Sequence, residues 1–139
     1  MRNVTKKLVN QISYKIIGAA IEVHRVLGPG LLESSYEKAL IHELNLRGLK
    51  TSSQQKIQIP YKGVILSEDL RYDILVEDLI VVENKAVTEM HPVFSAVTLS
   101  YMFHLQKPKG ILFNFHVQNI AKEGLKTFVN LFFEDLPEE

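Results

Sequence analysis

The fold is decided by the stretch Arg71-Tyr72-Asp73-Ile74-Leu75-Val76-Glu77-Asp78-Leu79-Ile80-Val81-Val82-Glu83-Asn84-Lys85-Ala86-Val87. Two runs rich in Ile, Leu and Val flank a short acidic turn, a pattern that predicts two buried strands joined as a hairpin. Asp73, Glu83 and Lys85 stand inside these apolar runs. Burying a charge is costly unless another charge or a metal ion compensates it. This conflict between pattern and chemistry marks the segment as a candidate functional site.

The length of the turn decides whether Asp73 and Glu83 meet. In an antiparallel pair, the numbers of facing residues add up to a constant. A two-residue loop, Glu77-Asp78, would place Asp73 opposite Val82, whereas a three-residue loop ending at Leu79 would place it opposite Glu83. The apolar pattern does not choose, because both faces are apolar. A divalent cation between the carboxylates would offset their repulsion, and we therefore predict the three-residue loop.

The predicted cluster has the chemistry of phosphodiester hydrolysis. Glu83 and Lys85 are two residues apart on a strand and point to the same face. A hard cation held by two or three carboxylates polarises a phosphate and lowers the pKa of a bound water. A lysine beside the cation stabilises the developing charge or helps to orient the water. The spacing alone fits a structural Glu83–Lys85 ion pair with an exposed Asp73 more often than a catalytic site.

Two helices and two short strands are predicted before the hairpin. Apolar residues at three- and four-residue steps indicate a helix over about residues 4–27, which Gly28-Pro29-Gly30 ends. A second helix is expected over about 31–47, with Gly48 at its C-terminal cap. Residues 50–55 read as a loop, and strands are expected at 56–61 and 64–66, with a turn at Lys62-Gly63.

After the hairpin, the sequence predicts a helix, a strand and a final helix. Pro92 suits the first turn of a helix that runs to about Leu105, with one face made of Val93, Val97, Tyr101 and Leu105. A strand is expected at 111–115 and a helix at about 120–133. The segment Leu131-Phe132-Phe133 is expected either to close the core or to contact a second copy of the chain, as in a homodimer. The predicted order is α-α-β-β-β-β-α-β-α, a single α/β domain over residues 1–139.

Composition narrows the classes of function. The 139 residues favour one domain with a substantial core. The chain has no cysteine, which excludes disulfides, zinc–thiolate sites and thiol nucleophiles. Lys and Arg number 16, as do Asp and Glu, so net charge gives no support for nucleic-acid binding. No segment has the length of a membrane span or the pattern of a signal peptide, and we expect a cytoplasmic protein without a membrane partner.

Two motifs together resemble a known nuclease family. Asp73 followed by Glu83-Asn84-Lys85 resembles the D…ExK core of the PD-(D/E)XK nuclease superfamily. Gly30-Leu31-Leu32-Glu33-Ser34-Ser35-Tyr36 matches the signature of the GxxExxY family, which is usually placed in that superfamily. The likeness extends from about Ile12 to Lys126. It implies an αβββαβ core, a central mixed sheet flanked by helices, and cleavage of nucleic acid, DNA more than RNA, with Mg²⁺ or Mn²⁺.

The resemblance also assigns roles to individual residues. Glu33, Asp73 and Glu83 would be catalytic carboxylates that bind the metal, and the carbonyl of Asn84 would add an oxygen. Lys85 would be the catalytic lysine. Tyr36 would pack under the site or form a hydrogen bond towards it.

One departure keeps a second hypothesis open. Relatives commonly carry glutamine four residues before the tyrosine of the following helix, whereas this chain has Val97 before Tyr101. Valine positions neither a water nor a phosphate. The first hypothesis is a metal-dependent nuclease. The second is a catalytically weakened or inactive descendant that uses the same fold for binding. An unrelated α/β domain with a structural acid cluster is the third.

Overall fold

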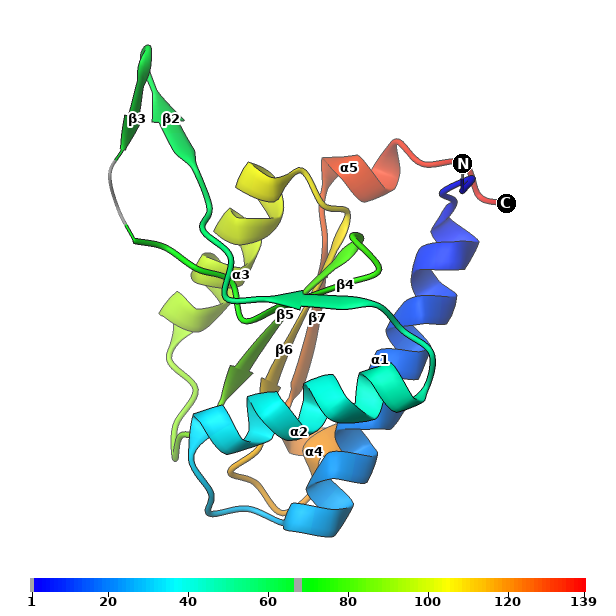
Figure 1. The fold of residues 1–139 in the computed structure, drawn as a ribbon, viewed down its shortest axis with the longest axis vertical. Coiled ribbons are helices and arrows are strands. Elements are labelled where there is room, and N and C mark those ends of the chain that lie inside the picture. The colour runs from blue at the N-terminus through cyan, green and yellow to red at the C-terminus, as the bar shows by residue number, and fades with distance from the viewer. Residues whose placement is uncertain (1, 67–68) are drawn as a thin grey trace.

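The computed structural model describes residues 2–66 and 69–139, which form a five-stranded sheet flanked by helices (Figure 1). The sheet order is β1-β4-β5-β6-β7, and β2 and β3 form a separate ribbon. The helices are α1 (Lys6–Leu27), α2 (Glu33–Leu46), α3 (Pro92–Leu105), α4 (Ile120–Glu123) and α5 (Leu131–Glu134). The strands are β1 (Thr51–Ser53), β2 (Ile59–Tyr61), β3 (Val64–Leu66), β4 (Ile74–Val76), β5 (Ile80–Lys85), β6 (Lys109–Asn114) and β7 (Leu125–Val129).

The central hairpin has the predicted three-residue loop. Val76 pairs with Ile80 and Ile74 pairs with Val82, the register that places Asp73 opposite Glu83. Glu77 and Asp78 in the loop have positive φ angles of 53° and 56°. This left-handed conformation makes the turn tight.

The sheet is mixed because its central pair is parallel. β5 and β6 run parallel, with Ile80 beside Lys109, and the other pairs in the sheet are antiparallel. Parallel neighbours need a crossover connection, and α3 provides it. The predicted α/β architecture, one mixed sheet flanked by helices, is confirmed.

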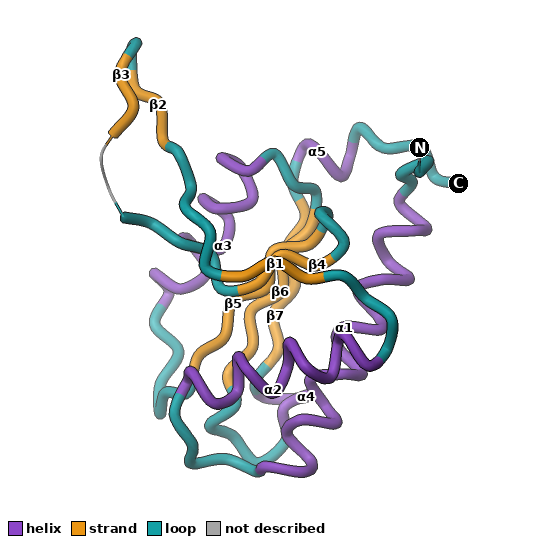
Figure 2. Tube along the Cα trace, viewed as in Figure 1, coloured by secondary structure: helices purple, strands orange, loops and turns teal. Residues whose placement is uncertain are grey.

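Helices cover both faces of the sheet (Figure 2). On one face, α1 and α2 pack through residues such as Ile16 and Leu40 against Ile74, Val82 and Phe113. On the other face, α3 packs through Met102 against a smaller cluster that includes Leu75 and Val81. Because strand residues alternate between faces, Glu83 and Lys85 lie on the α3 side of β5.

Several of the predicted elements differ in part from the observed ones. The expected loop at 50–55 contains β1, which pairs with β4. The expected helix at 120–133 is instead α4, β7 and α5, with β7 added antiparallel to β6. Gly124 caps α4 and ends it there, since glycine is a poor helix former. The buried residues of α3 are Thr98 and Met102, so the predicted face is displaced; Val93 is 47% exposed.

The three residues of the apolar segment Leu131-Phe132-Phe133 have different surroundings. Phe133 packs against the main core and Phe132 lies 6.5 Å from Phe103 between ring centroids, whereas Leu131 is 76% exposed. The C-terminal backbone is tied to α1, because Lys6 and Lys7 donate their N–H groups to the carbonyls of Pro137 and Glu138. Within the described part of the chain, no helix is both long enough and apolar enough to cross a membrane.

The β2–β3 ribbon projects away from the sheet (Figure 1). Its turn is at Lys62-Gly63, as predicted, and its tip residues 61–66 are all exposed. The predicted strand over 56–61 is regular only from Ile59, although Lys56 forms an isolated bridge with Arg71. The base of the ribbon therefore lies next to Asp73 in the chain.

Candidate active site

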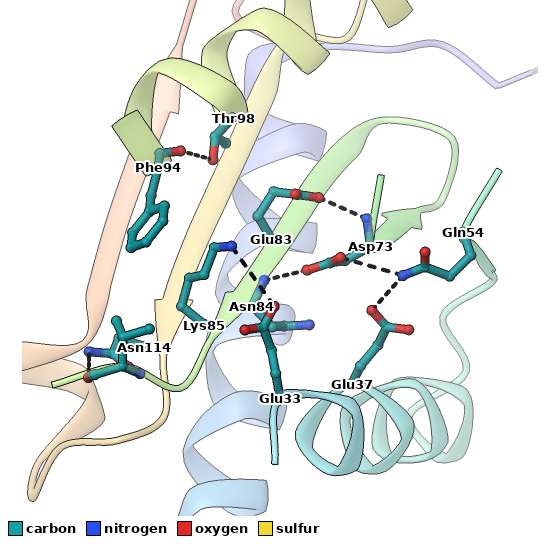
Figure 3. A network of polar contacts seen from close by, with 11 residues as sticks. Glu33, Glu37, Gln54, Asp73, Glu83, Asn84, Lys85, Phe94, Thr98 and Asn114 are labelled. Atoms are coloured by element: carbon teal, nitrogen blue, oxygen red, sulfur yellow. Dashed lines mark hydrogen bonds and ion pairs between the residues drawn. The ribbon is translucent and has the colours of Figure 1, made fainter. Parts of the chain in front are cut away.

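The residues predicted for the site come from three elements (Figure 3). Glu83 and Lys85 lie on β5, Asp73 immediately precedes β4, and Glu33 is the first residue of α2. The helices α2 and α3 approach this end of the hairpin from either side. The cluster is thus assembled by the sheet register and by the placement of two helix N-termini.

Asp73 and Glu83 interlock across the hairpin. The N–H of Asp73 donates to Glu83 Oε2 at 2.8 Å, and the N–H of Asn84 donates to Asp73 Oδ2 at 2.7 Å. Each carboxylate thus accepts a backbone hydrogen bond from the opposite strand. The predicted convergence of these two carboxylates is therefore present.

Burial and repulsion make the two carboxylates costly to ionise together. Burial, followed by the charge of Asp73, raises the pKa of Glu83 to about 8. Burial also raises the pKa of Asp73, against the opposing effects of the Asn84 N–H and the Lys85 charge. Such a pair of carboxyls shares its protons and titrates as a unit. A cation placed between them would favour the fully ionised state.

Glu33 is directed to Lys85. The distance from Lys85 Nζ to Glu33 Oε1 is 3.9 Å, and both side chains remain partly exposed. Burial raises the pKa of Glu33, Lys85 lowers it and Asp73 raises it again. Glu33 is thus close enough to sense both the lysine and the aspartate, and it contacts the lysine.

Two site residues were not predicted from the sequence. Gln54 Nε2 donates to Glu37 Oε1 at 2.9 Å and lies 3.4 Å from Asp73 Oδ1. Burial, followed by the charge of Asp73, raises the pKa of Glu37 to about 7. Glu37 follows Glu33 by four residues on α2, so the i, i+4 spacing of two acids was an available signal. Gln54 gave no signal, because the segment that carries it read as a loop.

Tyr36 shapes the loop before α2 and does not reach the site. Its side chain is fully buried and stacks on Phe115, with ring centroids 4.6 Å apart. Its hydroxyl donates to the carbonyl of Gly28 at 2.5 Å and accepts from the N–H of Leu31 at 3.1 Å. The hydrogen bond that we expected from Tyr36 towards the site is therefore wrong, because the hydroxyl bonds to the loop before α2. The tyrosine holds the Gly28–Leu31 loop that brings Glu33 to the sheet.

Asn84 has an unusual environment. Its side chain is fully buried, and neither its amide oxygen nor its amide nitrogen has a hydrogen-bond partner among the described residues. Because side chains alternate along β5, its side chain lies on the opposite face from Glu83 and Lys85. Only its main-chain carbonyl could join those residues around a metal, as the sequence interpretation required.

The carboxylates around Asp73 and Glu83 are suitable ligands for a hard cation, but they do not form a compact ligand group. Glu33, Glu37, Asp73 and Glu83 supply only carboxylate oxygens, which Mg²⁺ and Mn²⁺ prefer. Across residues 2–66 and 69–139, no group of three or more His, Asp or Glu side chains is close enough to hold a metal ion. Asp73 and Glu83 are the residues that would hold the ion, and Glu33 and Glu37 are further carboxylates within electrostatic reach of Asp73.

The α3 side of the site is aromatic. The ring of Phe94 lies under the Lys85 ammonium, 4.5 Å from Nζ to the ring centroid. Burial first, and then the charges of Glu83 and Asp73, raise the pKa of Tyr101. Val97 is half-buried one turn before Tyr101. Valine at this position has no polar group with which to contact a ligand.

Comparison with known proteins identifies the family. A family model of the PD-(D/E)XK nuclease superfamily matches residues 10–128, which include the hairpin and all four predicted catalytic residues. No curated protein and no solved structure matches the chain. The match covers most of the chain and agrees with the mixed sheet and the Asp73–Glu83 pairing. The chain belongs to the PD-(D/E)XK nuclease superfamily, and its general function is nuclease-like.

Proposed function

We propose that the protein is a metal-dependent nuclease that hydrolyses phosphodiester bonds of nucleic acid, DNA in preference to RNA. The observation that carries this proposal is the cross-strand interlock of Asp73 and Glu83, with Lys85 two residues further along β5. A buried carboxylate, Glu83, beside a half-buried one, Asp73, with both pKa values raised, is an unfavourable arrangement for stability alone. A divalent cation bound by the two carboxylates would offset this unfavourable energy.

The roles follow from the positions of the side chains. Asp73 and Glu83 would bind Mg²⁺ or Mn²⁺, with Glu33 and the Asn84 carbonyl as further oxygen donors. A bound cation of this kind polarises a phosphate and supplies an activated water. Lys85, which is partly exposed, would stabilise the negative charge that develops on the phosphate. The G-x-x-E-x-x-Y segment supports placing the chain in the GxxExxY group.

A calorimetric titration with Mn²⁺ tests the metal site without any assumption about the substrate. We expect binding by the wild type and its loss in Asp73→Asn and Glu83→Gln, because each change removes one anionic oxygen donor and little volume. Glu123→Gln, an exposed change on α4, is the matched control and should bind as the wild type does. Retained binding in both site variants, with or without a short oligonucleotide, would contradict the proposed site.

Lys85→Ala separates metal binding from chemistry. We expect this variant to bind Mn²⁺ and to lose cleavage of single- and double-stranded DNA and RNA substrates. Full cleavage by Lys85→Ala would remove the lysine from the mechanism.

A second candidate function is a binding module that has lost catalysis. It is favoured by Val97 in the place of a polar residue and by the ion pair between Glu33 and Lys85, which engages a carboxylate that the metal site would need. Binding of an oligonucleotide without Mn²⁺ affinity and without cleavage is the result expected for this module. Metal binding that Asp73→Asn abolishes would exclude it.

A further inference from the structure

The ammonium group of Lys85 has two neighbours of different chemistry (Figure 3). Glu33 Oε1, on α2, lies 3.9 Å from Nζ. The ring of Phe94, on α3, lies with its centroid 4.5 Å from Nζ, well within the range of a cation–π contact. The lysine therefore extends from β5 between the N-terminal turns of two helices.

The backbone of Phe94 is fixed by the way in which α3 begins. His91 is the N-cap, and its Nδ1 accepts the N–H of Val93 at 3.0 Å. Pro92 presets the helical φ of the first turn. One turn later, the hydroxyl of Thr98 donates to the carbonyl of Phe94 at 2.9 Å. The half-buried ring is thus carried by a capped helix turn, a rigid support compared with a loop.

The two neighbours affect the lysine differently. A carboxylate cancels the positive charge and competes with any phosphate for the ammonium. An aromatic face attracts the cation through its quadrupole and leaves the net charge in place. A free lysine side chain also loses considerable rotamer entropy when it is held in one position. A ring that already restrains the ammonium reduces the entropy that remains to be lost when a phosphate binds.

We propose that Phe94 is a positioning residue whose ring holds the Lys85 ammonium at the entrance to the site, whichever way Glu33 is turned. This role rests on the proposed nuclease-like function. Glu33 is needed by that function as an oxygen donor and cannot serve the cation and the lysine equally. Phe94 keeps Lys85 in place after Glu33 has turned to the carboxylates.

The contact itself is tested by NMR on the full chain with ¹³C-labelled lysine. An ammonium over a ring face brings its ε-methylene protons into the ring current, and we expect an upfield Lys85 signal, assigned by its loss in Lys85→Ala. Phe94→Leu should abolish the upfield shift and Phe94→Tyr should retain it. Phe103→Leu changes a ring on the same helix that lies beside His104 and Phe132, and should leave the signal unchanged. A wild-type signal at the ordinary lysine position would overturn the proposal.

The consequence for chemistry is tested by cleavage kinetics with Mn²⁺. We expect Phe94→Leu to lower kcat about tenfold, equivalent to about 1.4 kcal/mol, with KM little changed, and we expect Phe94→Tyr to restore it. Wild-type kcat in Phe94→Leu, despite a lost NMR shift, would overturn the positioning role.

A wild type that cleaves no substrate would refute the nuclease proposal, and phosphate binding then decides the role of Phe94. Inorganic phosphate should move the Lys85 ε signal, and Phe94→Leu should need about ten times more phosphate for the same change. Equal phosphate affinity in the two proteins would overturn the role, and a tenfold loss would support it.

Discussion

Two asparagines near the ends of the parallel strands have opposite surroundings. Asn114 on β6 is buried and satisfied: its amide oxygen accepts from the N–H groups of Val87 and His116, and its amide nitrogen donates to the Val87 carbonyl. Asn84 on β5 is equally buried, and its amide lacks such partners among the described residues. A buried polar group without a partner has lost its hydrogen bonds to water and gained none.

Replacing each asparagine with leucine should therefore change stability in opposite directions. Asn84→Leu should raise the free energy of unfolding by about 1–2 kcal/mol, because leucine has a similar size and removes the unsatisfied amide. Asn114→Leu should lower it by about 2–4 kcal/mol, because it leaves both backbone groups of Val87 without their partner. Urea unfolding of the two variants measures the difference. A loss of stability in Asn84→Leu would mean that a bound water satisfies the amide.

For individual residues, the sequence predicts which positions face each other across a single hairpin. Asp73 and Glu83 could be paired because a strand register is arithmetic once the loop length is known. Glu37 and Gln54 could not be added in the same way. The approach of Glu37 to Asp73 depends on how α2 crosses the sheet. The approach of Gln54 depends on its backbone conformation, a positive φ of 54° directly after β1. Neither feature is encoded in a local pattern.

Among the elements, the β4–β5 turn has a strained backbone, and its three-residue length brings the two carboxylates together. Glu77 and Asp78 both occupy the left-handed region, which is unfavourable for a residue with a Cβ and less so for aspartate. Glu77 is held by Arg2 and by the N–H of Lys50. Asp78 is exposed and pairs with Lys107, a contact that contributes little at the surface.

The turn predicts a difference between two substitutions of Asp78. Asp78→Gly should keep stability close to that of the wild type, because glycine adopts positive φ without strain. Asp78→Ala should be about 1 kcal/mol less stable than Asp78→Gly, since it retains the strain and both variants lack the ion pair. Thermal unfolding of the two proteins provides the comparison. Equal stabilities would show that the loop relaxes out of the left-handed region.

Two of the elements that the sequence did not predict, β1 and β7, lie at the edges of the sheet. Ile120, Leu125 and Phe128 suggested one helix, and Gly124 was too weak a signal to divide it. The strand β7 forms because β6 offers an open edge, which is tertiary information. The same holds for β1, three polar residues whose only sign of strand structure is their pairing with β4.

The whole molecule should respond to pH through the carboxyl pair of buried Glu83 and half-buried Asp73. Burial, followed by the charge of Asp73, raises the pKa of Glu83 in the folded chain to about 8, from an ordinary value of 4.5. Between these values the folded state binds more protons than the unfolded state, so this contribution to stability falls as pH rises. The effect is present in full below about pH 4.5 and is lost as pH rises through about 8.

We therefore expect the free energy of unfolding of the metal-free protein to decline from pH 5 to pH 8 more steeply in the wild type than in Glu83→Gln. The difference in slope should not exceed about 1.4 kcal/mol per pH unit for one proton. Glu123→Gln should keep the wild-type slope. Denaturant unfolding at several pH values with EDTA measures all three, and parallel profiles for wild type and Glu83→Gln would show that the carboxyl is solvated.

The three-residue turn also has a consequence for the order of folding. Asp73 and Glu83 are only ten residues apart, so closing their hairpin costs little chain entropy. The parallel partner β6 joins only after the α3 crossover, a contact of higher order and slower formation. We therefore expect the two carboxylates to approach each other while they are still hydrated. We expect them to lose their water only after the folding transition state, when α3 and β6 pack against the hairpin. Kinetic φ-values near one at the hairpin and near zero on α3 are the signature of that sequence of events.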